Sequence, residues 1–116
     1  MIRTELSLRL PNNAGALAGV CRLLADERVN VLAMSLGAPG ELRLVVDNHV
    51  HGAGVLRERR HDVAERDVLV VEAPSTAVAL RLIADAGINL NYSYGGSRTV
   101  VLGVDDVLRA SAASGL

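Results

Sequence analysis

The sequence contains no tryptophan and no phenylalanine, and Tyr92 and Tyr94 are its only aromatic residues. A core without aromatic rings must be filled by Leu, Val, Ile and Ala, which suits sheets packed against helices. The same shortage removes most of the surface on which nucleic-acid bases stack. The 12 basic and 13 acidic residues leave a net charge of −1, which supplies no field for attracting nucleic acid or an anionic membrane. We therefore expect no nucleic-acid and no membrane partner.

Cysteine and long apolar runs are also scarce. The single cysteine, Cys21, cannot form an internal disulfide, which is consistent with a reducing compartment. No apolar run approaches the roughly 18–20 residues needed to span a bilayer. The first five residues have neither the basic start nor the apolar stretch of a signal peptide. The sequence therefore predicts a cytoplasmic protein.

The pattern of apolar residues predicts an α+β fold. Leu6, Leu8 and Leu10 alternate with other residues, which indicates a half-buried strand. From Leu17 onward, apolar residues recur at the i, i+3, i+4, i+7 spacing of an amphipathic helix. The same two patterns alternate along the rest of the chain. We expect strands at residues 4–10, 30–36, 41–47, 62–73, 89–94 and 98–104, and helices at residues 17–24, 49–60, 75–86 and 107–113.

The order of elements repeats within the chain. Leu24-Ala25-Asp26 aligns with Ile83-Ala84-Asp85, and the strands that follow them align as well. The order strand, helix, strand, strand, helix, strand is that of the ferredoxin-like fold. The second copy has a shorter loop and helix, and the chain stops before a closing strand. We predict two units, residues 1–68 and 69–116, whose strands form one antiparallel sheet with helices on one face, the second repeat lacking its last strand.

Two segments carry a resemblance to a known family. Residues 11–17, Pro-Asn-Asn-Ala-Gly-Ala-Leu, precede a helix that leads into Val29-Asn30-Val31, and the helix of the second copy ends in Gly87-Ile88-Asn89. In this order the segments resemble an ACT domain, and nearly the whole chain is similar to stand-alone tandem ACT proteins. The resemblance implies a regulatory protein that binds an amino acid or similar small carboxylate at an interface between ACT-like units, and not an enzyme.

The resemblance also implies which residues bind the ligand. In ACT domains the loop from strand to helix presents backbone N–H groups at a helix N-terminus, where a carboxylate is favoured. Asparagines of this loop and of the second strand hold the ligand. The family's loop proline is replaced here by Ala14, and the second loop, residues 74–78, contains no glycine, so we expect the first unit to supply the loop. The expected ligand-binding residues are Asn12, Asn13, Ala14, Gly15, Ala16, Leu17, Asn30 and Asn89.

Each of these features also has a purely structural interpretation. Asparagine before a helix is commonly a cap and at a strand start a turn residue, so both interpretations stay open for the four asparagines. His49 and His51 have no third ligand nearby and no carboxylate cluster at metal spacing, so we expect no metal and no cofactor. Cys21 lies on the apolar helix stripe, where a core thiol is the ordinary role.

The same residues leave two alternative functions open and also predict an oligomeric state. The altered second loop is also compatible with a ligand-free regulatory or interaction subunit of a metabolic enzyme. An enzymatic function is the hypothesis with the least support, since the sequence contains no Ser/His/Asp or Cys/His set and no glycine-rich phosphate loop. A second repeat without its closing strand predicts an unpaired edge, and residues 97–102 carry one charge and no proline to protect it. We therefore expect a homodimer. The alternative is that the final helix or the N-terminus covers this edge within one chain.

Overall fold

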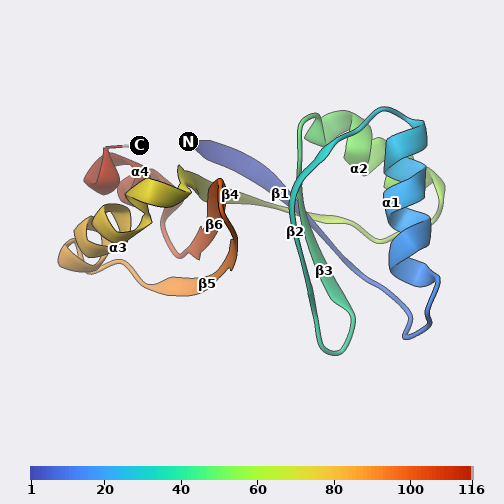
Figure 1. The fold of residues 1–116 in the computed structure, drawn as a ribbon, viewed down its shortest axis with the longest axis horizontal. Helices are drawn as coiled ribbons and strands as arrows, with labels where there is room; N and C mark the ends of the chain where they lie inside the picture. The colour runs from blue at the N-terminus through green and yellow to red at the C-terminus, as the bar shows by residue number, and fades with distance from the viewer. Residues whose placement is uncertain (116) are drawn as a thin grey trace. The chain divides into compact units, whose positions relative to one another are not determined.

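The computed structural model describes residues 1–115 and confirms the predicted α+β fold (Figure 1). Strands and helices alternate in the predicted order. A short 3₁₀ turn, η1 (Ala73–Ser75), precedes the third helix. The main elements are β1 (Ile2–Arg9), α1 (Ala16–Asp26), β2 (Val31–Gly37), β3 (Glu41–Val46), α2 (His49–Glu58), β4 (Ala64–Glu72), α3 (Thr76–Asp85), β5 (Leu90–Gly95), β6 (Thr99–Val104) and α4 (Val107–Ser114).

The chain divides into two compact units, and the division falls inside two strands. The first unit is Thr4–Arg66, whereas the second combines Met1–Arg3 with Asp67–Leu116. The described strands are hydrogen-bonded in the order β2-β3-β1-β4-β6-β5, and the pairs β1–β3, β2–β3, β4–β6 and β5–β6 are antiparallel. Both β1 and β4 therefore contribute residues to both units.

In the first unit, α1 and α2 cover one face of β1, β2 and β3 (Figure 1). The antiparallel register places Leu6 opposite Leu44 and Leu8 opposite Leu42, so these four leucines share that face. All four are buried in one cluster with Leu24 of α1. The alternation that predicted half-buried strands thus corresponds to a helix-covered aliphatic core.

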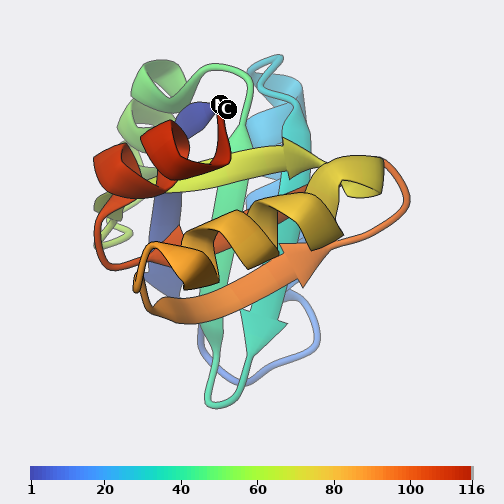
Figure 2. The same ribbon diagram turned by 90° about the vertical axis from the view of Figure 1, so that its left-hand side faces the viewer.

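In the second unit, α3 and α4 lie over the strands β4, β6 and β5 (Figure 2). Leu69 pairs with Leu102 in the β4–β6 register, and both side chains are fully buried. Ile83 of α3 and Ala110 of α4 join the same core cluster.

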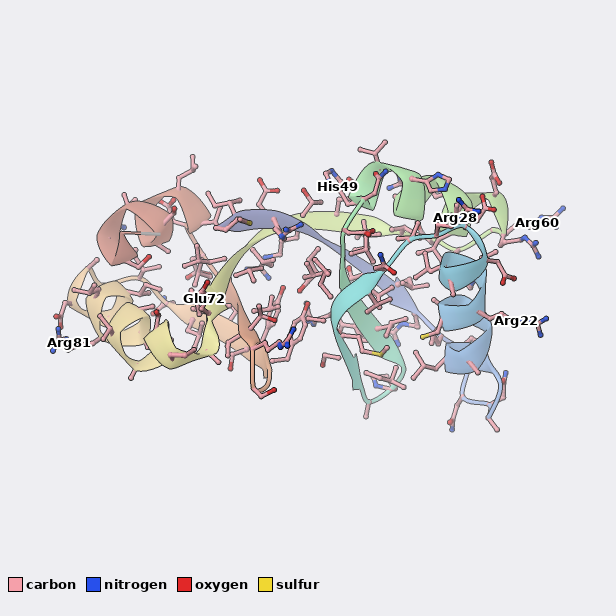
Figure 3. All side chains as sticks on the ribbon, turned by 45° about the horizontal axis from the view of Figure 1, so that its top comes forward. Arg22, Arg28, His49, Arg60, Glu72 and Arg81 are labelled. Atoms are coloured by element: carbon pink, nitrogen blue, oxygen red, sulfur yellow. The ribbon has the colours of Figure 1, made fainter. Side chains whose placement is uncertain are left out.

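Charged residues lie on the outer faces of the helices, and the labelled Arg22 of α1 and Arg81 of α3 extend away from the strands (Figure 3).

The first residues of the chain pair with β4, on the side away from β6. The amide of Val70 donates to the carbonyl oxygen of Met1 (2.7 Å), and the nitrogen of Met1 donates to the carbonyl oxygen of Val70 (3.0 Å). Residues 97–102 were expected to form an unpaired edge, but β6, which contains most of them, lies between β4 and β5. That premise for a homodimer is therefore wrong. The outermost described strands are β2 and β5.

Across residues 1–115, none of the helices has the length and apolar character required to cross a lipid bilayer.

The two glycines of α2 differ in their surroundings. A Cβ on buried Gly52 would meet Cγ2 of Val46 at 3.3 Å and Cγ1 of Val29 at 3.4 Å, so this glycine lets the helix approach the sheet. A Cβ on exposed Gly54 would meet no atom within 4 Å. We expect Gly54→Ala to raise the free energy of unfolding by about 1 kcal/mol, because alanine forms helix better than glycine.

The matched variant Gly52→Ala is expected to gain nothing or to lose stability, because its methyl group must displace Val46. Urea unfolding of both variants measures the difference. An equal stabilisation by the two substitutions would contradict the assigned role of Gly52.

Candidate functional site

A pocket of about 420 Å³ opens in the first unit beside the loop that the sequence singled out. One wall is formed by the end of β1, the loop and the first turn of α1. The other wall is formed by the end of β2 and the β2–β3 turn. The lining residues are Leu10, Pro11, Asn12, Asn13, Ala16, Leu17, Leu36, Gly37, Ala38, Pro39 and Gly40.

The loop wall is held by hydrogen bonds of Asn13. Its side-chain Oδ1 accepts from the Gly15 amide at 3.2 Å, and its own amide donates to the carbonyl oxygen of Pro11 at 2.9 Å. The Ala16 amide approaches the carbonyl oxygen of Asn13 at 3.4 Å. Asn13 therefore shapes the loop as a turn residue, which is the structural interpretation, while also lining the pocket.

The start of α1 leaves its electropositive end open. The N-cap residue, Gly15, makes no side-chain cap hydrogen bond, and within the described part of the chain the first turn of α1 has no acidic residue. A Cβ on Gly15 would approach only Oδ1 of Asn13, at 4.0 Å, so the space beside this residue is open. Backbone N–H groups at such a helix end favour a negatively charged group.

The opposite wall was not identified from the sequence as part of the site. The Leu10 amide donates to the carbonyl oxygen of Gly40 at 2.8 Å, and the Gly40 amide donates to that of Gly37 at 2.7 Å. These bonds tie the β2–β3 turn to the end of β1. Residues 37–40, Gly-Ala-Pro-Gly, are typical of a turn, but only the β1–β3 register places this turn beside the end of β1 and the loop.

The expected ligand residues do not all come together. Asn12, Asn13, Ala16 and Leu17 line the pocket. Ala14 and Gly15 lie within the same loop, between lining residues. The remaining two expected residues lie outside the pocket lining and are Asn30 and Asn89.

Asn30 is engaged by an acidic side chain of its own unit. Its amide nitrogen donates to Oδ1 of Asp47 at 3.0 Å, and its side-chain Nδ2 donates to Oδ2 at 2.8 Å. The Asp47 amide in turn donates to the carbonyl oxygen of Asn30 at 3.0 Å. This pair joins the start of β2 to the end of β3.

The second repeat contains a related arrangement around Asn89. The Asp105 amide donates to the carbonyl oxygen of Asn89 at 3.3 Å, which matches the main-chain bond between Asp47 and Asn30. Here Nδ2 of Asn91 donates to Oδ1 of Asp105 at 2.9 Å. The side-chain amide thus comes from two residues further along the strand.

The bonds from Asn30 hold the pKa of the Asp47 carboxyl below its ordinary value, through the backbone amide first and the side-chain amide second. A carboxyl whose pKa is lowered by folding stabilises the protein above its unfolded pKa, and that contribution is lost as the pH falls through the folded pKa. Asp47 therefore contributes to stability at neutral pH and ceases to do so in the acidic range below about pH 4.

We expect Asn30→Ala to raise the pKa of Asp47 toward its ordinary value, because the side-chain donor is lost. Carboxyl ¹³C chemical shifts, followed by NMR as the pH is lowered, measure this pKa directly. Asn91→Ala is the matched control, since its amide binds Asp105 instead. An unchanged Asp47 titration in Asn30→Ala would contradict the assignment.

The second loop differs from the first in its backbone. Residues Ala73–Ser75 form the 3₁₀ turn, and α3 begins directly at Thr76. The shortened connection recognised in the sequence thus takes the form of a helical turn in place of an open loop.

The remaining candidates lie apart from the pocket lining. His51 Nε2 is 3.8 Å from Oε1 of Glu27, a surface pair between α2 and the end of α1. No group of three His, Cys, Asp or Glu side chains suited to a metal ion occurs within residues 1–115. Cys21 is half-buried and is not in a disulfide.

Comparison with known proteins gives similarity in structure but not in sequence. No family model and no curated protein sequence matches the chain. Protein BT0572 from Bacteroides thetaiotaomicron superposes with a TM-score of 0.88 at 23% identity, covering 97% of this chain and 86% of that one.

The other similar structures include aspartate kinases and their regulatory parts. The ligand-free regulatory subunit of aspartate kinase from Thermus thermophilus superposes with a TM-score of 0.68 at 14% identity, covering 99% and 94% of the two chains. Aspartokinase III from E. coli, in complex with lysine and aspartate, gives a TM-score of 0.62 at 17% identity, covering 97% and 30%. The chain therefore has an ACT-like fold.

Proposed function

We propose that the chain is a non-catalytic regulatory protein of the cytoplasm, a tandem ACT protein that binds an amino acid or similar small carboxylate. The observation that carries the proposal is the pocket of about 420 Å³ beside the 11–17 loop. Ligand pockets of proteins occupy roughly 300–1,000 Å³. The similar fold of the Thermus thermophilus regulatory subunit supports a regulatory role, and the lysine and aspartate of E. coli aspartokinase III support this ligand class.

The chemistry of the loop supports a carboxylate at this position. The uncapped first turn of α1 offers backbone N–H groups to a negative charge, and Asn12 lines the pocket with a side chain able to accept from an ammonium group. Asn30 already donates hydrogen bonds to Asp47 from its backbone amide and from its side-chain Nδ2. The proposal therefore rests on the loop of the first unit.

A thermal-shift screen of the twenty amino acids tests the proposal. A true ligand at 100 times its dissociation constant stabilises the folded protein by about 2.7 kcal/mol. Gly15→Val is expected to abolish this stabilisation by blocking approach to the loop backbone, without disturbing the fold, because the space beside Gly15 is open. Ser75→Ala, in the connection before α3, serves as the control.

Two outcomes would contradict the proposal. The first is a panel of amino acids that leaves the unfolding temperature unchanged. The second is an equal loss of binding in Gly15→Val and Ser75→Ala, which would remove the distinction between the two loops.

We also propose a homodimer in which the ligand lies at an interface between ACT-like units of two chains. The edge strand β2 supports this assembly, because its side chains of Leu32, Met34 and Leu36 are 46%, 41% and 49% exposed. Exposed apolar edge strands recruit another chain, and two-fold dimers are the commonest oligomers. Light scattering at micromolar concentration would contradict the dimer if the mass stayed at 12.2 kDa at every concentration.

The second candidate is a ligand-free interaction subunit of a metabolic enzyme. The same exposed β2 side chains favour it, since an apolar edge also fits another protein. An unfolding temperature that none of the twenty amino acids changes would support this alternative over the ligand-binding function.

A further inference from the structure

We infer that the ligand of this pocket is an amino acid with an uncharged, aliphatic side chain. The inference rests on the proposed function and narrows its ligand class. Three features of the pocket support it: the chemistry of the lining, the confinement of its polar side chains to one wall, and the pairing of the charged residues next to the lining.

Among the residues that the structure describes, none with a charged side chain lines the pocket. The eleven lining residues are leucine, proline, alanine, glycine and two asparagines. A charged ligand side chain entering this pocket would lose water without gaining an ion-pair partner, which is unfavourable. An aliphatic side chain would instead exchange water for contact with Leu10, Leu17 and Leu36.

The polar side chains of the lining are confined to one wall. Asn12 and Asn13 are both on the loop wall, next to the open N-terminus of α1. The facing wall consists of residues 36–40, Leu-Gly-Ala-Pro-Gly, none of which has a polar side chain. This lining suits a molecule whose charged α-amino acid group lies beside the two asparagines and whose hydrocarbon chain contacts the leucines.

The charged residues next to the lining are directed elsewhere. Arg9 and Glu41 precede and follow lining residues and stand opposite each other in the β1–β3 register. They alternate with the buried Leu8–Leu42 pair, so they lie on the other face of the sheet. The carboxylate of Glu41 is 2.8 Å from Nη2 of Arg43 and is already paired.

Isothermal titration calorimetry with matched ligands tests the inference. Norleucine and lysine have side chains of similar length that differ in the terminal charge. We expect norleucine, leucine and isoleucine to bind, and norleucine to bind about tenfold or more tightly than lysine, because the described lining offers no ion-pair partner for the ammonium group of the lysine side chain. Aspartate and glutamate are expected to be weaker than leucine for the same reason.

Variants at Leu36 test whether this pocket decides the preference. Leu36 is 49% exposed, so Leu36→Glu is compatible with folding and places a carboxylate in the lining. We expect this variant to bind norleucine about tenfold more weakly and lysine more tightly than the parent protein, which reverses the preference. Leu36→Gln should weaken norleucine without the gain for lysine.

Leu90→Glu is the matched control for the added charge. Leu90 lies on the edge strand β5 with 42% exposure and belongs to the second unit. This variant should leave both affinities unchanged. Circular dichroism verifies that each variant keeps its secondary structure.

The possible outcomes distinguish a failure of the aliphatic preference from a failure of the proposed function. Binding of lysine or aspartate as tight as that of norleucine overturns the aliphatic preference and leaves the proposed function standing. The same holds if Leu36→Glu and Leu90→Glu change the affinities alike. An absence of binding by every amino acid contradicts the proposed function itself, and the present inference with it.

Discussion

Leu24→Ala and Ile83→Ala are each expected to lower the free energy of unfolding by about 2–5 kcal/mol, the range for removing a large buried aliphatic side chain. The two residues occupy equivalent positions in the repeat, near the end of α1 and of α3. Leu24 is fully buried in the core of the first unit, and Ile83 is 2% exposed in the core of the second. Because none of the described residues in either core cluster is aromatic, each aliphatic side chain contributes a large share of the packing.

Urea unfolding, followed by far-ultraviolet circular dichroism, measures both effects. Val78→Ala is the control, since Val78 lies on α3 but is 54% exposed, and surface substitutions usually change stability by no more than about 0.5 kcal/mol. If Ile83→Ala were as mild as Val78→Ala, the assignment of Ile83 to the second core would be wrong.

Most of the fold could be predicted because its strands and helices have one apolar face. The alternation of Leu6, Leu8 and Leu10 is visible in sequence, and so is the helical spacing that leads to Leu24. The run at residues 62–73 was less informative. Val68 and Leu69 are adjacent in β4 and both are fully buried, so this strand shows no alternation at its centre.

The pairing of the N-terminus could not be predicted from periodicity. Met1 and Val70 exchange main-chain hydrogen bonds across a separation of 69 residues. Main-chain pairing of this kind depends on which strands meet in the sheet, and the side-chain pattern of each strand does not encode its neighbour. The sequence therefore left two possibilities for this edge, pairing with another chain or coverage within the same chain, and the structure shows that Met1 pairs with Val70.

Only part of the candidate site could be predicted, because the rest again depends on which strands are paired. The loop at residues 11–17 has a local signal, a polar break between a strand and a helix. The second wall depends on the sheet register and on the bond from Leu10 to Gly40, which join residues 30 positions apart. The hydrogen bond between Asn30 and Asp47 likewise could not be recognised from the residues around Asn30, because Asp47 is 17 residues away.

Gly40→Ala is expected to lower the free energy of unfolding by roughly 2–4 kcal/mol, and this effect follows from the geometry of the second wall. Gly40 has a φ of 111°, a conformation that residues with a Cβ rarely adopt, and such backbone strain costs about 1–3 kcal/mol. A Cβ at this position would also collide with the carbonyl oxygen of Leu10. Relief of the collision separates the turn from β1 and weakens the Leu10–Gly40 hydrogen bond, worth about 1 kcal/mol.

Gly37→Ala is the matched control, because Gly37 belongs to the same turn and lines the same pocket. A Cβ on Gly37 would meet no atom within 4 Å, so its substitution should change stability by no more than about 0.5 kcal/mol. Urea unfolding compares the two variants, and calorimetry with the best aliphatic ligand follows the pocket. We expect Gly40→Ala to lose ligand affinity together with stability, because the displaced turn is one wall of the binding site. Equal stability of the two variants would show that the turn is not held against β1 in the way that the Leu10–Gly40 bond implies.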